Sequence, residues 1–142
     1  MRRVLRRHRA ITAISLTVAG TAAVFPATAA AEEPALHDVT YTVYTERPFF
    51  ADIYYRDTDP PNFGDYSHNP YLFSPKAEAQ LGPDQPWVLN VKLANPRHWA
   101  MVLGTSGRST EPPNFHCTLA IDGEVVVTNS GLKGALCSLR LW

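Results

Sequence analysis

Cysteine is scarce in this chain of 142 residues, which contains only Cys117 and Cys137. The sequence has no Cys-x-x-Cys, no His-x-His and no His-Glu-x-x-His, which are the spacings that zinc sites commonly use. The histidines after residue 31 are instead scattered singly, as His37, His68, His98 and His116. We interpret them as surface or loop residues, and we expect no metal ion and no cofactor.

A nucleophile–base–acid set is also missing. Residues 104–108 (GTSGR) resemble a nucleophile elbow but lack the glycine two positions after the serine. Asp57 and Asp59 have the spacing that opens a calcium loop, but the third acid and the glycine are absent. His116 and Cys117 are neighbours on a predicted strand, so their side chains point to opposite faces. These observations make a secreted hydrolase the least favoured function class, and we expect no catalytic residues.

No run of about 20 apolar residues, the length of a membrane-spanning helix, is present. Residues 10–25 are apolar but diluted by threonine and serine; five arginines precede them, and Pro26 and small residues follow. This pattern predicts a signal peptide over residues 1–31, cut before Glu32 or after Ala29. An uncleaved anchor is the alternative, with membrane contact only through residues 10–31. Both predict export, with residues 32–142 as an extracytoplasmic domain.

Excess positive charge is absent from the predicted mature part. The whole chain has 13 basic and 13 acidic residues, and five arginines leave with residues 1–31, so 8 basic and 13 acidic residues remain, a net charge of −5. An acidic surface argues against nucleic acid as a partner and against docking on anionic lipid by charge.

Long helical patterns are lacking after residue 31, whereas apolar and polar residues alternate in short segments, as in β-strands. The expected strands are residues 38–45, 49–56, 87–93, 98–103, 115–121, 124–128 and 135–141. We expect residues 87–93 to be central, residues 76–81 to form one helical turn, and residues 71–74 to form at most a short edge strand. About seven strands without a substantial helix predict an all-β sandwich.

Asp122-Gly123 is a two-residue hairpin signal between two of these strands. Cys117 and Cys137 are both in the inward phase of their strands, and in an exported chain they most simply form a disulfide. In a plain three-strand meander their strands would lie about 9.5 Å apart, beyond the roughly 4.4–6.8 Å between bridged Cα atoms. The last strand must therefore flank residues 115–121 on their other side or face them from the opposite sheet.

The stretch from residue 58 to 75 combines prolines with aromatic side chains, and long loops of this kind are often functional. Its aromatic residues are the candidate binding surface: Phe63, Tyr66, Tyr71 and Phe73. The alternative is that most of them pack as a satellite core under the loop.

Five segments together resemble the MmpS family of small actinobacterial exported membrane proteins. They are VTYTV at 39–43, ADIYYRD at 51–57, PW at 86–87, CTLAIDGEV at 117–125 and GALC at 134–137. The resemblance implies a basic N-terminus with a membrane segment and an extracytoplasmic, immunoglobulin-like β-sandwich. It also implies an accessory role beside MmpL transporters of the RND superfamily, which export lipids and siderophores, and no enzyme activity.

Two features depart from that pattern: the N-terminus looks cleavable, and the 58–75 loop is longer and more aromatic. They favour an alternative, a freely secreted module that binds a lipid, glycan or protein through this loop.

Overall fold

A computed structural model describes residue 20 and residues 22–141. The compact unit treated below begins at Glu33. Most of the predicted signal or anchor segment, residues 1–31, lies outside the described residues, and the described residues 22–36 form neither helix nor strand.

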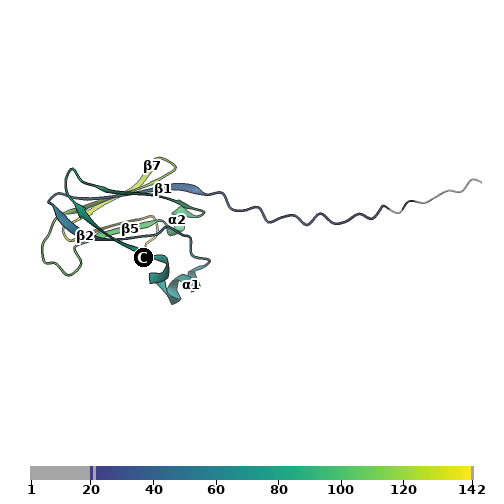
Figure 1. Cartoon of the computed structure of the whole chain (residues 1–142), viewed down its shortest axis with the longest axis horizontal. Coiled ribbons are helices and arrows are strands. Elements are labelled where there is room, and N and C mark those ends of the chain that lie inside the picture. Colours follow the sequence, from purple (N-terminus) through teal and green to yellow (C-terminus); the bar gives the residue numbers. More distant parts are fainter. Residues whose placement is uncertain (1–19, 21, 142) are drawn as a thin grey trace, which may run out of the picture. The chain divides into compact units, whose positions relative to one another are not determined.

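The compact unit is a sandwich of two antiparallel four-stranded sheets (Figure 1). The first sheet has the order β4-β1-β6-β7: Trp87–Leu93, His37–Thr45, Phe115–Ile121 and Glu124–Gly131. The second sheet has the order β3-β2-β5-β8: Lys76–Leu81, Phe49–Tyr55, Met101–Thr105 and Gly134–Ser138. Three short helices lie between strands: α1 Phe63–His68, the 3₁₀ helix η1 Pro70–Phe73 and α2 Pro96–Trp99.

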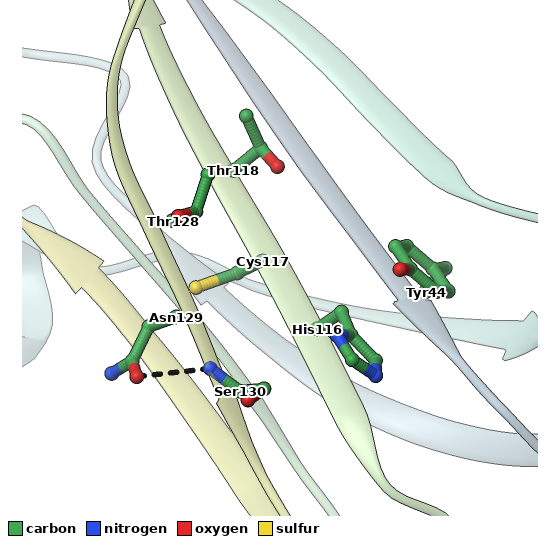
Figure 2. A pocket seen from close by; sticks show the side chains of 7 residues that line it. All are labelled: Tyr44, His116, Cys117, Thr118, Thr128, Asn129 and Ser130. Carbon is green, nitrogen blue, oxygen red and sulfur yellow. Dashed lines mark hydrogen bonds between the residues drawn. The ribbon is translucent and has the colours of Figure 1, made fainter.

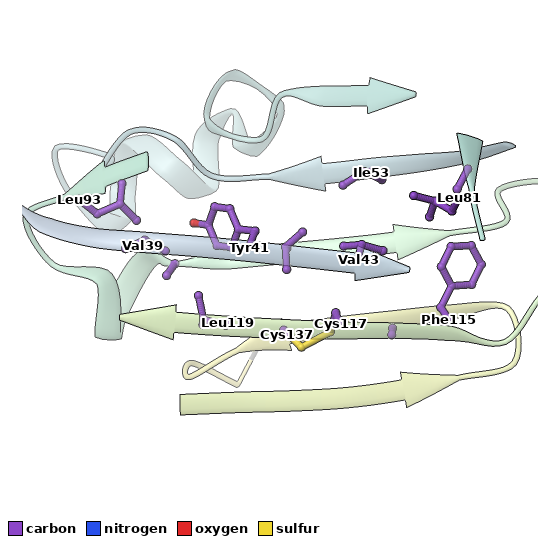
Figure 3. Packing of buried hydrophobic residues seen from close by; sticks show 14 residues of the cluster. Val39, Tyr41, Val43, Ile53, Leu81, Leu93, Phe115, Cys117, Leu119 and Cys137 are labelled. Atoms are coloured by element: carbon purple, nitrogen blue, oxygen red, sulfur yellow. A yellow bond between two sulfur atoms is a disulfide. The ribbon is translucent and has the colours of Figure 1, made fainter. Parts of the chain in front are cut away.

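Strict alternation along β1 and β6 builds the core between the sheets (Figure 3). Val39, Tyr41 and Val43 are buried, and the side chains between them are only partly covered. The buried Tyr41 hydroxyl donates to the Arg56 carbonyl at 2.7 Å and accepts from the Met101 amide at 3.3 Å. Burial raises the pKa of Tyr41, so this hydroxyl stays protonated and keeps both bonds.

The disulfide joins the two sheets. Cys117 on β6 and Cys137 on β8 are bonded with Cα atoms 6.0 Å apart, and β8 belongs to the second sheet. The predicted pairing is confirmed, and so is the prediction that the last strand cannot complete a meander with the strand of Cys117. Of the two arrangements left open, the structure has the last strand in the facing sheet.

The Asp122-Gly123 hairpin is confirmed between β6 and β7. Both residues have positive φ, 50° and 83°, as a type I′ turn requires. The Asp122 carboxylate also hydrogen-bonds to the His37 ring at 2.7 Å and accepts from the Asp38 amide at 2.9 Å, so the turn holds the start of β1. The His37 hydrogen bond, followed by the Asp38 bond, lowers the pKa of Asp122.

The described residues form eight strands where about seven were expected, because residues 76–81 are strand β3 and not a helical turn. Lysine, alanine and glutamate favour helices, but pairing with β2 overrides that preference. Ala77, Ala79 and Leu81 face the core, so a period of two is visible in this segment after all.

Several other expected boundaries are wrong. Strand β4 is an edge strand rather than the central one, although Trp87, Leu89, Val91 and Leu93 do face inward. The expected strand 98–103 is divided, because Pro96 starts α2 before β5 begins at Met101. The expected turn at 129–131 is strand, because Gly131 still pairs with Phe115, and the chain turns at residues 132–133. The expected edge strand at 71–74 is the helix η1, which begins at Pro70.

Candidate binding surface

Arg56 closes the long connection between β2 and β3 at both ends. Its side chain is fully buried, although it carries a positive charge. Nε donates to the Phe73 carbonyl at 3.2 Å, and Nη2 donates to Ser74 Oγ at 3.2 Å. The Tyr55 amide donates to the Pro75 carbonyl at 3.1 Å beside this contact. The segment from 57 to 75 is therefore a closed loop whose two ends meet at Arg56.

Tyr66 on α1 packs inward against this arginine. The Arg56 guanidinium carbon lies 4.6 Å from the centre of the Tyr66 ring and 5.6 Å from that of Trp99. The Tyr66 and Trp99 rings are themselves 5.5 Å apart, and Trp99 on α2 is buried. Cation–π contacts of this kind are stronger away from water. Tyr66 thus fastens α1 to the body of the domain.

Phe63, also on α1, contacts Arg140 in the C-terminal segment. The Arg140 guanidinium carbon is 4.5 Å from the Phe63 ring centre and 5.5 Å from the Trp99 ring centre. Arg140 Nη1 lies 2.9 Å from His98 Nε2 on α2. Arg140 therefore links α1 and α2.

Polar groups fix the start of the segment. The Asp59 carboxylate accepts hydrogen bonds from the amides of Ala94 and Asn95, just past β4. The Asn62 side chain caps α1 by accepting from the Asp65 amide at 2.9 Å. The segment from 57 to 75 is therefore fixed by hydrogen bonds at several points along its length.

The side chains that this segment leaves in solvent are large and apolar. The exposed fractions are 51% for Phe63, 81% for Tyr71 and 72% for Leu72. We call these three residues the α1–η1 surface. Large apolar groups on a held segment are typical of an interaction site.

The four predicted residues divide into two pairs. Phe63 and Tyr71 are exposed as a binding surface requires, whereas Tyr66 and Phe73 are half-buried. Sequence reasoning missed Leu72, because a single leucine among aromatic residues carries no pattern. It also missed Arg56, whose position at the end of an alternating strand gives no sign that the charge is buried.

A hollow of about 340 Å³ lies on the outer face of the first sheet (Figure 2). Tyr44 stacks on His116 with ring centres 4.7 Å apart, and His116 Nε2 is 2.9 Å from Glu46 Oε1. Hydrogen bonds, first from Asn114 and then from His116, lower the pKa of Glu46. The other lining residues are Cys117, Thr118, Thr128, Asn129 and Ser130. Cys117 is in the disulfide, so this hollow offers hydroxyl and amide groups rather than a reactive thiol.

Among residues 20 and 22–141, no group of three or more His, Cys, Asp and Glu side chains is placed to hold a metal ion. Within the same residues, no helix has the length and apolar character needed to cross a membrane.

The fold and its cross-linked sheets define a disulfide-bonded, antiparallel β-sandwich with an exposed apolar segment between β2 and β3. The chain belongs to the family described as the Rv2576c beta-sandwich domain, whose model matches residues 41–137. It is similar to the uncharacterized protein Rv2576c of Mycobacterium tuberculosis, with 35% identity over 133 residues, covering 94% of this chain and 85% of that protein. The uncharacterized protein Mb2606c of Mycobacterium bovis is similar to the same extent, at 35% identity over 133 residues.

Proposed function

We propose that this protein is a non-enzymatic, exported binding protein of the cell envelope that contacts its partner through the α1–η1 surface. The observation that carries the proposal is the exposure of Tyr71 and Leu72 on a segment anchored by Arg56. A surface held in place before binding loses little conformational entropy when a partner docks. Its apolar and aromatic side chains suit a partner with an apolar face.

Export is supported by two features. The basic, then apolar, then small-residue pattern of residues 1–31 is that of a signal segment. A disulfide between Cys117 and Cys137 persists in oxidising compartments and is rare in the cytosol.

The more specific form of the proposal is an accessory role like that of MmpS proteins, beside an RND-type transporter. Its support is the resemblance over residues 39–137 together with the β-sandwich fold. The alternative is a freely secreted module that binds a lipid, glycan or protein through the same segment. The cleavable appearance of residues 27–31 favours this alternative.

The mature N-terminus separates the two forms. We expect a membrane-bound chain that retains Met1 if the protein serves a transporter, and a chain in the medium that begins at Glu32 if it is freely secreted. N-terminal sequencing of both fractions decides between them. Labelling by a serine- or cysteine-directed activity probe would contradict the non-enzymatic part of the proposal.

The binding surface is tested by placing a photo-crosslinking amino acid at Tyr71 in the producing cell. We expect a discrete adduct from this position, which mass spectrometry then assigns to a transporter, another protein or a lipid. Val125 on β7 is the matched control, because it is 55% exposed and belongs to the first sheet. Equal adducts from both positions, or none from Tyr71, would rule out the α1–η1 surface.

A further inference from the structure

Among the described residues, strand β4 is the least protected edge of this sandwich, because Lys92 is its only charged side chain. Exposed strand edges present unpaired N–H and C=O groups, and monomeric proteins usually blunt them with charges, bulges or a covering segment. Strand β4 pairs only with β1, and it offers seven residues, WVLNVKL, rich in apolar side chains. Val88, which points outward from it, is 52% exposed.

The other three edge strands are protected by charges or by contacts with each other. Strand β3 carries outward-facing charges, and Lys76 Nζ lies 3.1 Å from Asp52 Oδ1 and 3.0 Å from Glu78 Oε1. Strands β7 and β8 lie at the same side of the sandwich, and Asn129 Nδ2 donates to the Leu136 carbonyl at 3.0 Å between them. Contacts between β7 and β8 therefore cover these two edges.

The inward face of β4 is also incompletely covered. Trp87, Leu89 and Val91 point toward the second sheet but are only partly buried, whereas the matching residues of β1 are fully buried. A further strand beside β4 would cover this apolar area as well as pair the free backbone groups.

We propose that β4 pairs with β4 of a second copy of this chain, antiparallel and centred on Asn90. Two-fold symmetry requires self-complementarity, and this register provides it. Trp87 faces Leu93 of the second copy and Leu89 faces Val91, so inward residues meet inward residues. Lys92 faces Val88, so no like charges meet, and Asp38 Oδ1 already lies 2.6 Å from Lys92 Nζ. The result is one continuous eight-stranded sheet across two copies.

The interface is small, because it consists of one strand from each copy. Such contacts bury little surface and dissociate readily, so we expect a weak dimer with a high dissociation constant. The dissociation constant is measured by sedimentation equilibrium at about 10 μM to 1 mM protein. The sample is the chain as the producing cells export it. Wild-type protein that stays monomeric up to 1 mM would overturn the proposal.

Two substitutions at one exposed position test the register. Val88→Lys places a lysine opposite Lys92 twice, once on each side of the symmetry axis, and should weaken the dimer by about 2- to 30-fold. Val88→Glu places a carboxylate opposite the same lysine and should preserve or tighten it. Both side chains point to solvent in the monomer, so circular dichroism should show an intact fold for both. Equal dissociation constants for the two variants would exclude this register.

A covalent trap gives an independent measurement. Asn90→Cys brings two cysteines together on the axis, where antiparallel strand partners have Cα atoms about 4.5–5.5 Å apart, within the range of a disulfide. We expect a disulfide-linked dimer in a glutathione redox buffer, with Val125→Cys on β7 remaining monomeric. Equal cross-linking at both positions, or none at residue 90, would contradict pairing through β4.

Discussion

Gly104 faces the interior of the sandwich from β5, opposite the side chains of Val43 and Phe115. A Cβ at this position would lie 2.6 Å from Val43 Cγ1 and 3.0 Å from Phe115 Cδ1, both below ordinary contact distances. These neighbours belong to the first sheet, and both are fully buried. The absence of a side chain at residue 104 therefore makes room for the first sheet.

Gly104→Ala is expected to destabilise the fold by about 1–3 kcal/mol, the usual cost of overpacking a core. Gly82→Ala is the matched control, because the nearest atom to its added Cβ is at 3.9 Å, an ordinary contact. Urea unfolding of both variants measures the difference in free energy. A Gly104→Ala variant as stable as Gly82→Ala would show that the two sheets can move apart without cost.

Asp122 gives the hairpin a dependence on pH. Its folded-state pKa is lowered by the hydrogen bonds from His37 and Asp38, so its contribution to stability is present above the unfolded pKa, about 3.9, and is lost as pH falls through the folded value. Asp122→Asn retains a residue that tolerates positive φ but removes the charge. We expect the variant to melt below wild type at pH 6 and the difference between the two melting temperatures to shrink as pH falls through the folded value. A difference that does not change with pH would assign the effect to the turn rather than to the carboxylate.

At the scale of elements, the segment from 57 to 75 is the part of the fold that depends most on a single side chain. Arg56 supplies two charge-assisted hydrogen bonds to Phe73 and Ser74 and contacts the Tyr66 ring. Each such bond contributes about 1.5–3 kcal/mol, and both acceptors belong to the segment rather than to the strands of the sandwich. The segment should therefore loosen more than the sandwich.

Arg56→Met is expected to speed amide hydrogen exchange across residues 62–75 by about 10- to 100-fold, while β1 and β6 change little. Arg97→Met is the control, because Arg97 is exposed on α2 and its loss should leave the segment unchanged. Hydrogen exchange read by mass spectrometry reports both. Uniform acceleration throughout the chain would mean that Arg56 supports the whole core instead.

The elements differed in how far sequence could predict them. Strands β1, β2 and β6 were predicted to within a residue or two, because burial on one face imposes a strict alternation on their residues. Strand β3 was missed, since Lys76 and Glu78 on an edge suit a helix equally well. The edge position of β4 could not be predicted, because alternation reports which face is buried and not how many neighbours a strand has. For the segment from 57 to 75, composition pointed to its aromatic side chains, of which Phe63 and Tyr71 are exposed. The contacts of Arg56 that order this segment could not be predicted from sequence.

At the scale of the whole molecule, the disulfide holds the facing sheets together. In the chain-entropy model, closing a loop of about 20 residues contributes about 3 kcal/mol, a large share of the roughly 5–15 kcal/mol typical of a domain. The bond restricts the last strand to two positions relative to residues 115–121, because bridged Cα atoms tolerate only a narrow range of distances. Strand spacing alone is enough to predict this restriction.

Replacing both cysteines by alanine should therefore lower the melting temperature by about 10–20 °C. Both side chains are buried, and the substitution leaves no unpaired thiol to react. Reduction of the wild-type protein by a phosphine should produce a similar loss, which separates the effect of the bond from that of the lost side-chain volume. A fall of less than about 3 °C in both experiments would exclude a stabilising role for the bond.

The same disulfide also determines how the domain responds to tension applied between the two ends of the chain. Cys137 lies close to the C-terminus, so a pull on that end reaches β6 through the sulfur atoms and bypasses residues 118–136. Those residues, which include all of β7, cannot be drawn out while the bond is intact. The cysteines are separated by 20 positions in the sequence, which extend to about 70 Å, so reduction should add somewhat less than that to the fully stretched chain. While the cross-link is intact, a pull on the two ends therefore leaves β7, one edge of the first sheet, outside the stretched part of the chain.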